Sequence, residues 1–94
     1  ILIMITEQEI KKLVQEGRRK EAIALLEEQL KVQGPEELVL MQLGELIYAE
    51  GQMANALNKF NAVIRLNPEN QKARNYVTMI NGILGYYCKD LLNP

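Results

Sequence analysis

Few side chains in this sequence are arranged for catalysis. Glu27 and Glu28 are adjacent, as are Glu36 and Glu37, and paired carboxylates are a common source of acid–base chemistry. On a helix, however, neighbouring side chains diverge by about 100° and cannot act on one substrate. We therefore expect all four carboxylates to be solvated.

A reactive thiol or a metal site has no better support. The sequence contains no histidine and a single cysteine, Cys88. No cluster of charges near Cys88 argues for a lowered thiol pKa. The sequence also has no glycine-rich phosphate loop and no group with the spacing of metal ligands. We expect no enzymatic activity, no cofactor and no metal; a hydrolysis that depended on Cys88 would contradict this.

Charge and hydropathy argue against nucleic acids and membranes as partners. The net charge is −1, and the basic run Arg18-Arg19-Lys20 is followed directly by Glu21, which is typical of a solvated helix start. No stretch approaches the roughly 18 apolar residues of a membrane helix. The run Ile1–Ile5 is too short for a signal peptide and has no basic lead-in. Because one cysteine gives no sign of an oxidising compartment, we expect a cytoplasmic protein.

The size of the chain predicts one domain of modest stability. Its 94 residues are 48% hydrophobic, which is enough for a core and too much for a disordered chain. A chain of this length buries only about 60–65% of its unfolded surface. The apolar run Ile1–Ile5 has two explanations: either the natural start is Met4, or these residues pack on the first helix or on a second copy of the chain.

Glycine and proline residues divide the chain into five expected helices. The first is predicted to begin at Thr6, because Thr6 and Glu9 have the spacing of a capping box, and Gly17 ends it. Pro68 punctuates the chain later, since proline cannot continue a helix interior. The expected helices are at about 6–16, 36–50 and 52–66, with one more between Gly17 and Gly34-Pro35 and another that begins near Asn70 or Gln71.

Apolar stripes at helical spacing define the expected core. In the last three helices the stripe residues are Leu40, Leu43 and Ile47, then Met53, Ala56, Leu57, Phe60, Val63 and Ile64, then Ala73, Val77, Ile80 and Leu84. Gly44 adjoins the first of these stripes, although glycine inside a helix costs about 1 kcal/mol relative to alanine. We therefore expect a second helix to approach Gly44 closely.

The pattern is repeated along the chain. Gly17, Gly51 and Gly85 are 34 residues apart, and Ala22 and Ala56 share this interval. Self-similarity at such a period is the signature of a helical solenoid. The match is weaker towards the ends, as expected for terminal repeats, which have one face in water.

The central ladder resembles the tetratricopeptide repeat (TPR) family. Its residues are Leu40, Leu43-Gly44, Ile47, Gly51, Ala56, Phe60 and Pro68. The resemblance is strong for this repeat, fair for the one before it and weak for the helix after it. It implies an all-α, right-handed superhelix in a single domain, 1–94. The implied parts are repeat 1 at about 6–35, repeat 2 at about 36–69 and a capping helix at about 70–90.

The resemblance also implies a concave surface lined by the first helix of each repeat, where partners commonly bind. The candidate contact residues on that side are Leu38, Met41, Glu45, Tyr48, Lys72, Asn75 and Met79. For those before residue 50 there is an alternative, because a middle helix flanked by neighbours is apolar all round for packing alone. Some family members grip a terminal carboxylate with Lys, Asn and Arg. Glu7 and Glu45 oppose that activity here, so an apolar peptide or helix is the expected ligand.

Two functions therefore compete, and both are non-catalytic. The first is a scaffold that binds another protein or peptide. The alternative is self-assembly into a homodimer or a longer array, through the apolar N-terminus and Tyr86, Tyr87, Leu91 and Leu92. Gly82 and Gly85 weaken the fifth helix, so either another group approaches them closely or the helix frays there.

Overall fold

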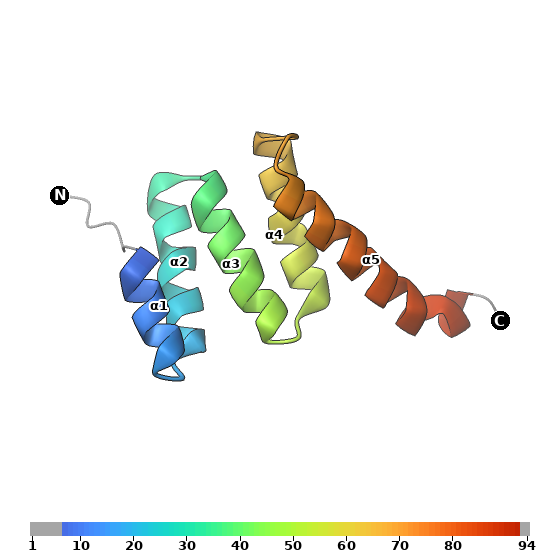
Figure 1. Cartoon of the computed structure of the whole chain (residues 1–94), viewed down its shortest axis with the longest axis horizontal. Coiled ribbons are helices and arrows are strands. Elements are labelled where there is room, and N and C mark those ends of the chain that lie inside the picture. Colours follow the sequence, from blue (N-terminus) through green and yellow to red (C-terminus); the bar gives the residue numbers. More distant parts are fainter. Residues whose placement is uncertain (1–6, 93–94) are drawn as a thin grey trace.

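The regular structure of the chain is helical throughout the residues described. A computed structural model describes the backbone of residues 7–92 and the side chains of residues 7–85. The helices are α1 (Glu7–Gln15), α2 (Arg19–Gln33), α3 (Glu37–Ala49), α4 (Met53–Leu66) and α5 (Gln71–Leu92). Consecutive helices run in opposite directions (Figure 1). The predicted all-α class is confirmed.

The observed helix ends lie within two residues of the predicted ones. Three of the turns use glycine with a positive φ, namely Gly17 (77°), Gly34 (85°) and Gly51 (82°). This left-handed conformation is accessible to glycine because it has no Cβ, and it ends a helix cleanly. The predicted capping box cannot be compared, because Thr6 lies outside the described residues.

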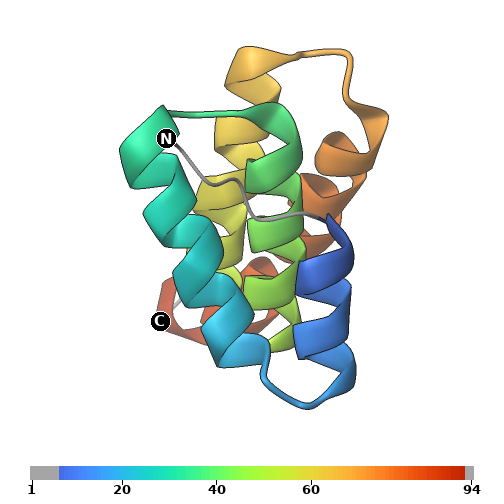
Figure 2. The same cartoon turned by 90° about the vertical axis from the view of Figure 1, so that its left-hand side faces the viewer.

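The helices form two layers with the core between them. Seen from the N-terminal side, α2 and α4 lie to one side of α1 and α3 (Figure 2). The largest fully buried side chains come from four of the helices: Leu26, Leu43, Ile47, Phe60, Val63 and Ile80. α3 contributes six buried residues, more than α1, α2 or α4, and apart from Gly44 they are all apolar residues of a mostly apolar helix.

The expected close approach at Gly44 is confirmed. A Cβ built on Gly44 would lie 2.8 Å from Cε1 and 2.9 Å from Cζ of Phe60. Phe60 is fully buried, so its ring fills the space that a side chain at position 44 would need. This contact explains why a helix interior contains glycine at this point.

Gly82 and Gly85 do not behave as expected. The helix is continuous through both residues to Leu92. Apart from their chain neighbours and the nearby backbone of α5 itself, no described atom lies within 4 Å of a Cβ built on either glycine. The residues proposed for self-assembly, both Ile1–Ile5 and the side chains of Tyr86, Tyr87, Leu91 and Leu92, lie outside the described part, as does the thiol of Cys88.

The expectation that all four paired carboxylates are solvated is wrong for Glu37. Glu27, Glu28 and Glu36 are exposed, but Glu37 is half-buried. Its Oε2 accepts hydrogen bonds from Nδ2 of Asn67 (2.9 Å) and Nδ2 of Asn70 (2.6 Å). Sequence spacing gave no sign of this contact, because the partners lie 30 and 33 residues further along the chain.

A candidate partner-binding face on α1, α3 and α5

Four of the seven predicted contact residues meet where α3 lies against α5. Nζ of Lys72 is 3.1 Å from Oε2 of Glu45. The hydroxyl of Tyr48 donates a hydrogen bond to Sδ of Met79, at 3.7 Å. The structure therefore brings α3 into side-chain contact with α5, and Tyr48 and Met79 are 31 residues apart in sequence.

Tyr76 also lies at this contact between α3 and α5, which we call the seam, and the sequence analysis missed it. Its ring stacks on Phe60, with centroids 4.3 Å apart and an interplanar angle of 5°. It meets Tyr48 edge-on, at 5.4 Å and 70°. Its hydroxyl donates a hydrogen bond to Oε2 of Glu45, at 3.1 Å. The spacing of the sequence does indicate a core position for Tyr76, because it lies three residues after Ala73 and four before Ile80.

The surroundings of Tyr76 keep its hydroxyl protonated. Burial raises the pKa of Tyr76 to about 12, and the negative charge of Glu45 and the hydrogen bond to it act in the same direction. A phenolate would lose water contacts and would face the Glu45 carboxylate. With its pKa raised to about 12, Tyr76 therefore remains a donor to Glu45 even at alkaline pH values at which an ordinary tyrosine ionises.

The other three predicted contact residues lie apart from this seam. Leu38 is 54% exposed near the start of α3, where its side chain is open to solvent. Met41 is only 7% exposed and belongs to the core, as the packing alternative anticipated. Asn75 is exposed, and its Oδ1 accepts a hydrogen bond from Nε2 of Gln71 on its own helix. Met41 is thus the predicted contact residue that a partner reaches least easily.

An open groove of about 430 Å³ lies between α3 and α1, and Glu45 of the α3–α5 contact is also one of its lining residues. We call it the α1–α3 groove. Its lining residues are Glu7, Ile10, Lys11, Val14 and Gln15 from α1, with Gln42, Glu45 and Leu46 from α3. Ile10 is buried, while Val14 and Leu46 are half-buried. The groove therefore combines a partly exposed apolar surface with polar side chains.

Helical spacing explains how α3 serves both the core and the groove. Leu43 and Ile47 point into the core and are almost fully buried. Gln42 and Glu45 lie on the other side of the helix, because residues one or two positions from a core residue are rotated far from it. Glu45 is central on this face, since it lines the groove and also binds Lys72 and Tyr76 of α5.

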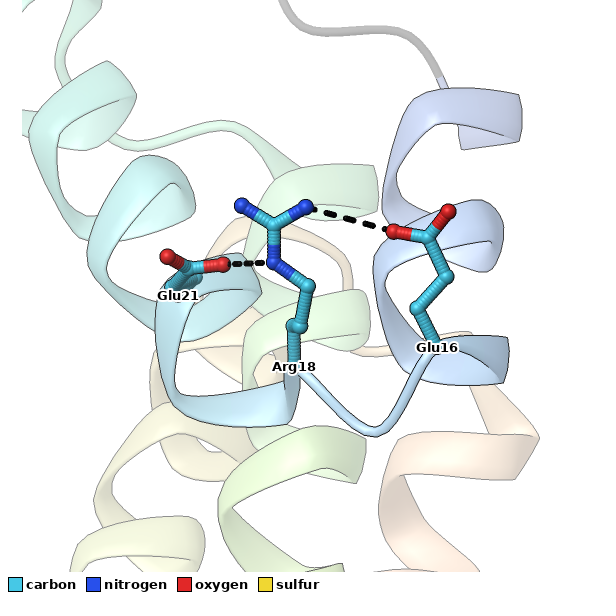
Figure 3. A network of polar contacts seen from close by, with 3 residues as sticks. All are labelled: Glu16, Arg18 and Glu21. Atoms are coloured by element: carbon cyan, nitrogen blue, oxygen red, sulfur yellow. Dashed lines mark hydrogen bonds and ion pairs between the residues drawn. The ribbon is translucent and has the colours of Figure 1, made fainter.

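The basic run at the start of α2 is matched by carboxylates. Arg18 bridges Glu16 and Glu21, as Figure 3 shows. Nη1 of Arg19 lies 3.2 Å from Oε1 of Glu50. This arrangement agrees with the interpretation of the run as a solvated helix start.

Within residues 7–92, no helix has the length and apolar character needed to cross a membrane. The described side chains also contain no group of three or more His, Cys, Asp or Glu that could hold a metal ion. Comparison with protein-family models, with curated proteins and with solved structures gave no match.

Proposed function

We propose that this chain is a small helical solenoid of the tetratricopeptide kind that binds a peptide or helix of another protein, without catalysing a reaction. The observation that carries the proposal is the α1–α3 groove. It lies between the first helices of the two proposed repeats and has a partly exposed apolar floor. The ladder at 34-residue intervals and the succession of antiparallel helices support the solenoid.

The groove suits an apolar segment better than a small metabolite. Val14 and Leu46 are half-buried, so a partner side chain placed on them removes further apolar surface from water. Such burial contributes about 25 cal/mol per Å². A groove between parallel helical walls is the usual site for an amphipathic helix or an extended peptide.

A peptide selection with two matched variants tests this proposal. A random peptide library displayed on phage is selected against the whole protein, and selected peptides are titrated against wild type, Val14→Glu and Val32→Glu. Val32 is 54% exposed on α2, so Val32→Glu makes the same change outside the groove. Circular dichroism verifies that both variants keep their helices.

We expect Val14→Glu to weaken peptide binding about tenfold or more, because it places a charge on the apolar floor. Val32→Glu should leave the affinity close to that of wild type. Failure to select any peptide, or equal affinity in both variants, would contradict binding in this groove.

A further inference from the structure

Glu45 lines the α1–α3 groove and also binds Lys72 and Tyr76 of α5, and this double role affects which ligands the groove can bind. We propose that the α1–α3 groove selects a partner segment in which a lysine or arginine adjoins apolar residues, with Glu45 as the receptor for the cation. This inference rests on the proposed function and specifies its ligand. It also assigns a role to Lys72, as an internal occupant of the cation position.

Glu45 already binds a cation of the chain itself. Oε2 of Glu45 lies 3.1 Å from Nζ of Lys72. The Lys72 side chain is 65% exposed, whereas that of Glu45 is 32% exposed. An exposed lysine on a flexible stem is weakly held in such a pair, which contributes about 0–1 kcal/mol. A cation from a partner can therefore replace Lys72 at little cost, while the carboxylate stays in place.

The distribution of charge along the groove also favours a cation. Glu7 and Lys11 lie one turn apart on α1, so their charges oppose each other on that wall. The α3 wall offers the Glu45 carboxylate and the Gln42 amide, and no described cation of α3 lines it. Once Lys72 is displaced, the charged groove residues Glu7, Lys11 and Glu45 leave one net negative charge, two carboxylates against one ammonium. A partner carboxylate would be repelled there, and a partner cation would be attracted.

An apolar floor lies in the same groove as Glu45. Lysine and arginine side chains lay their methylene groups on apolar surface and carry the charge to its edge. Val14 and Leu46 provide half-buried apolar surface in the same groove as Glu45. A cation on an alkyl stem thus matches both the floor and the carboxylate, which a purely apolar side chain does not.

The test uses two small probes of the same length and shape, hexylguanidinium and hexylurea, which differ in charge. Each is titrated into the isotopically labelled full-length protein, and the amide signals of Val14 and Leu46 are followed by NMR. In wild type we expect hexylguanidinium to bind about two- to fivefold more tightly than hexylurea, as an exposed ion pair allows. In Glu45→Gln, which retains an acceptor for Tyr76, this ratio should fall to about one.

A pair of lysine variants separates displacement of Lys72 from a general change in charge. Lys72→Met removes the internal competitor, so it should tighten hexylguanidinium binding by about twofold or more, with little effect on hexylurea. Lys31→Met removes the same charge from an exposed position on α2 and should leave both affinities near those of wild type.

Three results would overturn the inference: no preference for hexylguanidinium in wild type, no loss of preference in Glu45→Gln, or equal effects of the two lysine variants. These failures are distinct from failure of the proposed function. If selected peptides bind in a Val14-dependent way but replacing their arginines by neutral citrulline changes nothing, the function stands and the cation preference is wrong. If no peptide binds in that way, the function itself is wrong.

Discussion

At the scale of single residues, the space around Phe60 is the most tightly constrained. One edge of its ring occupies the position where a Cβ of Gly44 would lie. Tyr76 stacks on its face, with ring centroids 4.3 Å apart. Phe60 is fully buried between α3, α4 and α5, so the ring has little freedom to move away. Close-packed interiors of this kind respond even to one added methyl group.

Gly44→Ala should therefore destabilise the protein, although alanine is the better helix former. Overpacking of a filled core costs about 1–3 kcal/mol. Replacing a helical glycine by alanine gains about 1 kcal/mol in helix propensity, which is less than the upper part of the overpacking cost. Gly82→Ala is the matched control, because a Cβ there meets no described atom within 4 Å. Chemical denaturation should show a lower free energy of unfolding for Gly44→Ala and a higher one for Gly82→Ala. Stabilisation by both changes would contradict the tight contact with Phe60.

The raised pKa of Tyr76 predicts a loss of folding stability at alkaline pH. Its pKa is raised from 10.0 to about 12 in the folded chain, so the hydroxyl ionises more easily after unfolding. The stabilisation from this residue is complete below pH 10 and is lost as the pH rises through about 12. Unfolding in denaturant at a series of alkaline pH values should show this loss in wild type and in Tyr48→Phe. In Tyr76→Phe this alkaline loss of stability should be absent. An unchanged pH dependence in that variant would show that Tyr76 is not its source.

At the scale of elements, the turn between α4 and α5 is held by hydrogen bonds of polar side chains, in addition to the apolar packing of the two helices. Glu37, in the first turn of α3, accepts hydrogen bonds from Asn67 and Asn70 on either side of Pro68. Oδ1 of Asn70 in turn accepts a hydrogen bond from the backbone N–H of Ala73, which caps α5. One carboxylate thus connects the start of one helix to the start of the helix after next.

Glu37→Ala should lower the free energy of unfolding by about 1–3 kcal/mol, because it leaves two half-buried amide groups without their acceptor. Glu36→Ala, at the adjacent and exposed position, should change it by about 0.5 kcal/mol or less. Thermal or denaturant unfolding of both variants provides the measurement. Equal effects of the two changes would show that the junction does not depend on the Glu37 carboxylate.

At the scale of the whole molecule, the core is concentrated in the middle of the stack. α3 has six buried residues, whereas α1 has nine residues in all and buries only Ile10. In a linear stack each helix is stabilised chiefly by its neighbours, so an end helix has support from one side. The α1–α3 groove therefore has one firmly held wall, α3, and one weakly held wall, α1.

Native-state hydrogen exchange should reproduce this gradient. We expect the amides of α3 and α4 to exchange most slowly and those of α1 to exchange fastest among the first four helices. Local opening of α1 exposes less buried apolar surface, so it costs less free energy. Ile10→Ala should speed exchange in α1 further and leave α4 nearly unchanged. Protection of α1 equal to that of α3 would contradict a stack with a weak end.

Much of the local structure could be predicted from the sequence. The helix ends followed from glycine and proline positions, and the close approach at Gly44 followed from the cost of glycine in a helix. The site was harder to predict. Periodicity placed Glu45, Tyr48, Lys72 and Met79 on the sides of α3 and α5 that meet, but it also offered Met41, which is buried. Tyr76 and the groove residues Ile10, Val14 and Gln15 of α1 were not proposed as contacts, because their roles depend on the helix beside them.

The sequence alone determined where the helices lie and which side of each is apolar, because propensity, turn residues and helical spacing act within a few residues. Only the tertiary structure decided which side chains from different helices meet. The contacts of Glu45 with Lys72 and Tyr76, and of Glu37 with Asn67 and Asn70, join residues about 30 positions apart. Such contacts depend on how closely and at what angle the helices pack, and that geometry is set by the volumes of the buried side chains together.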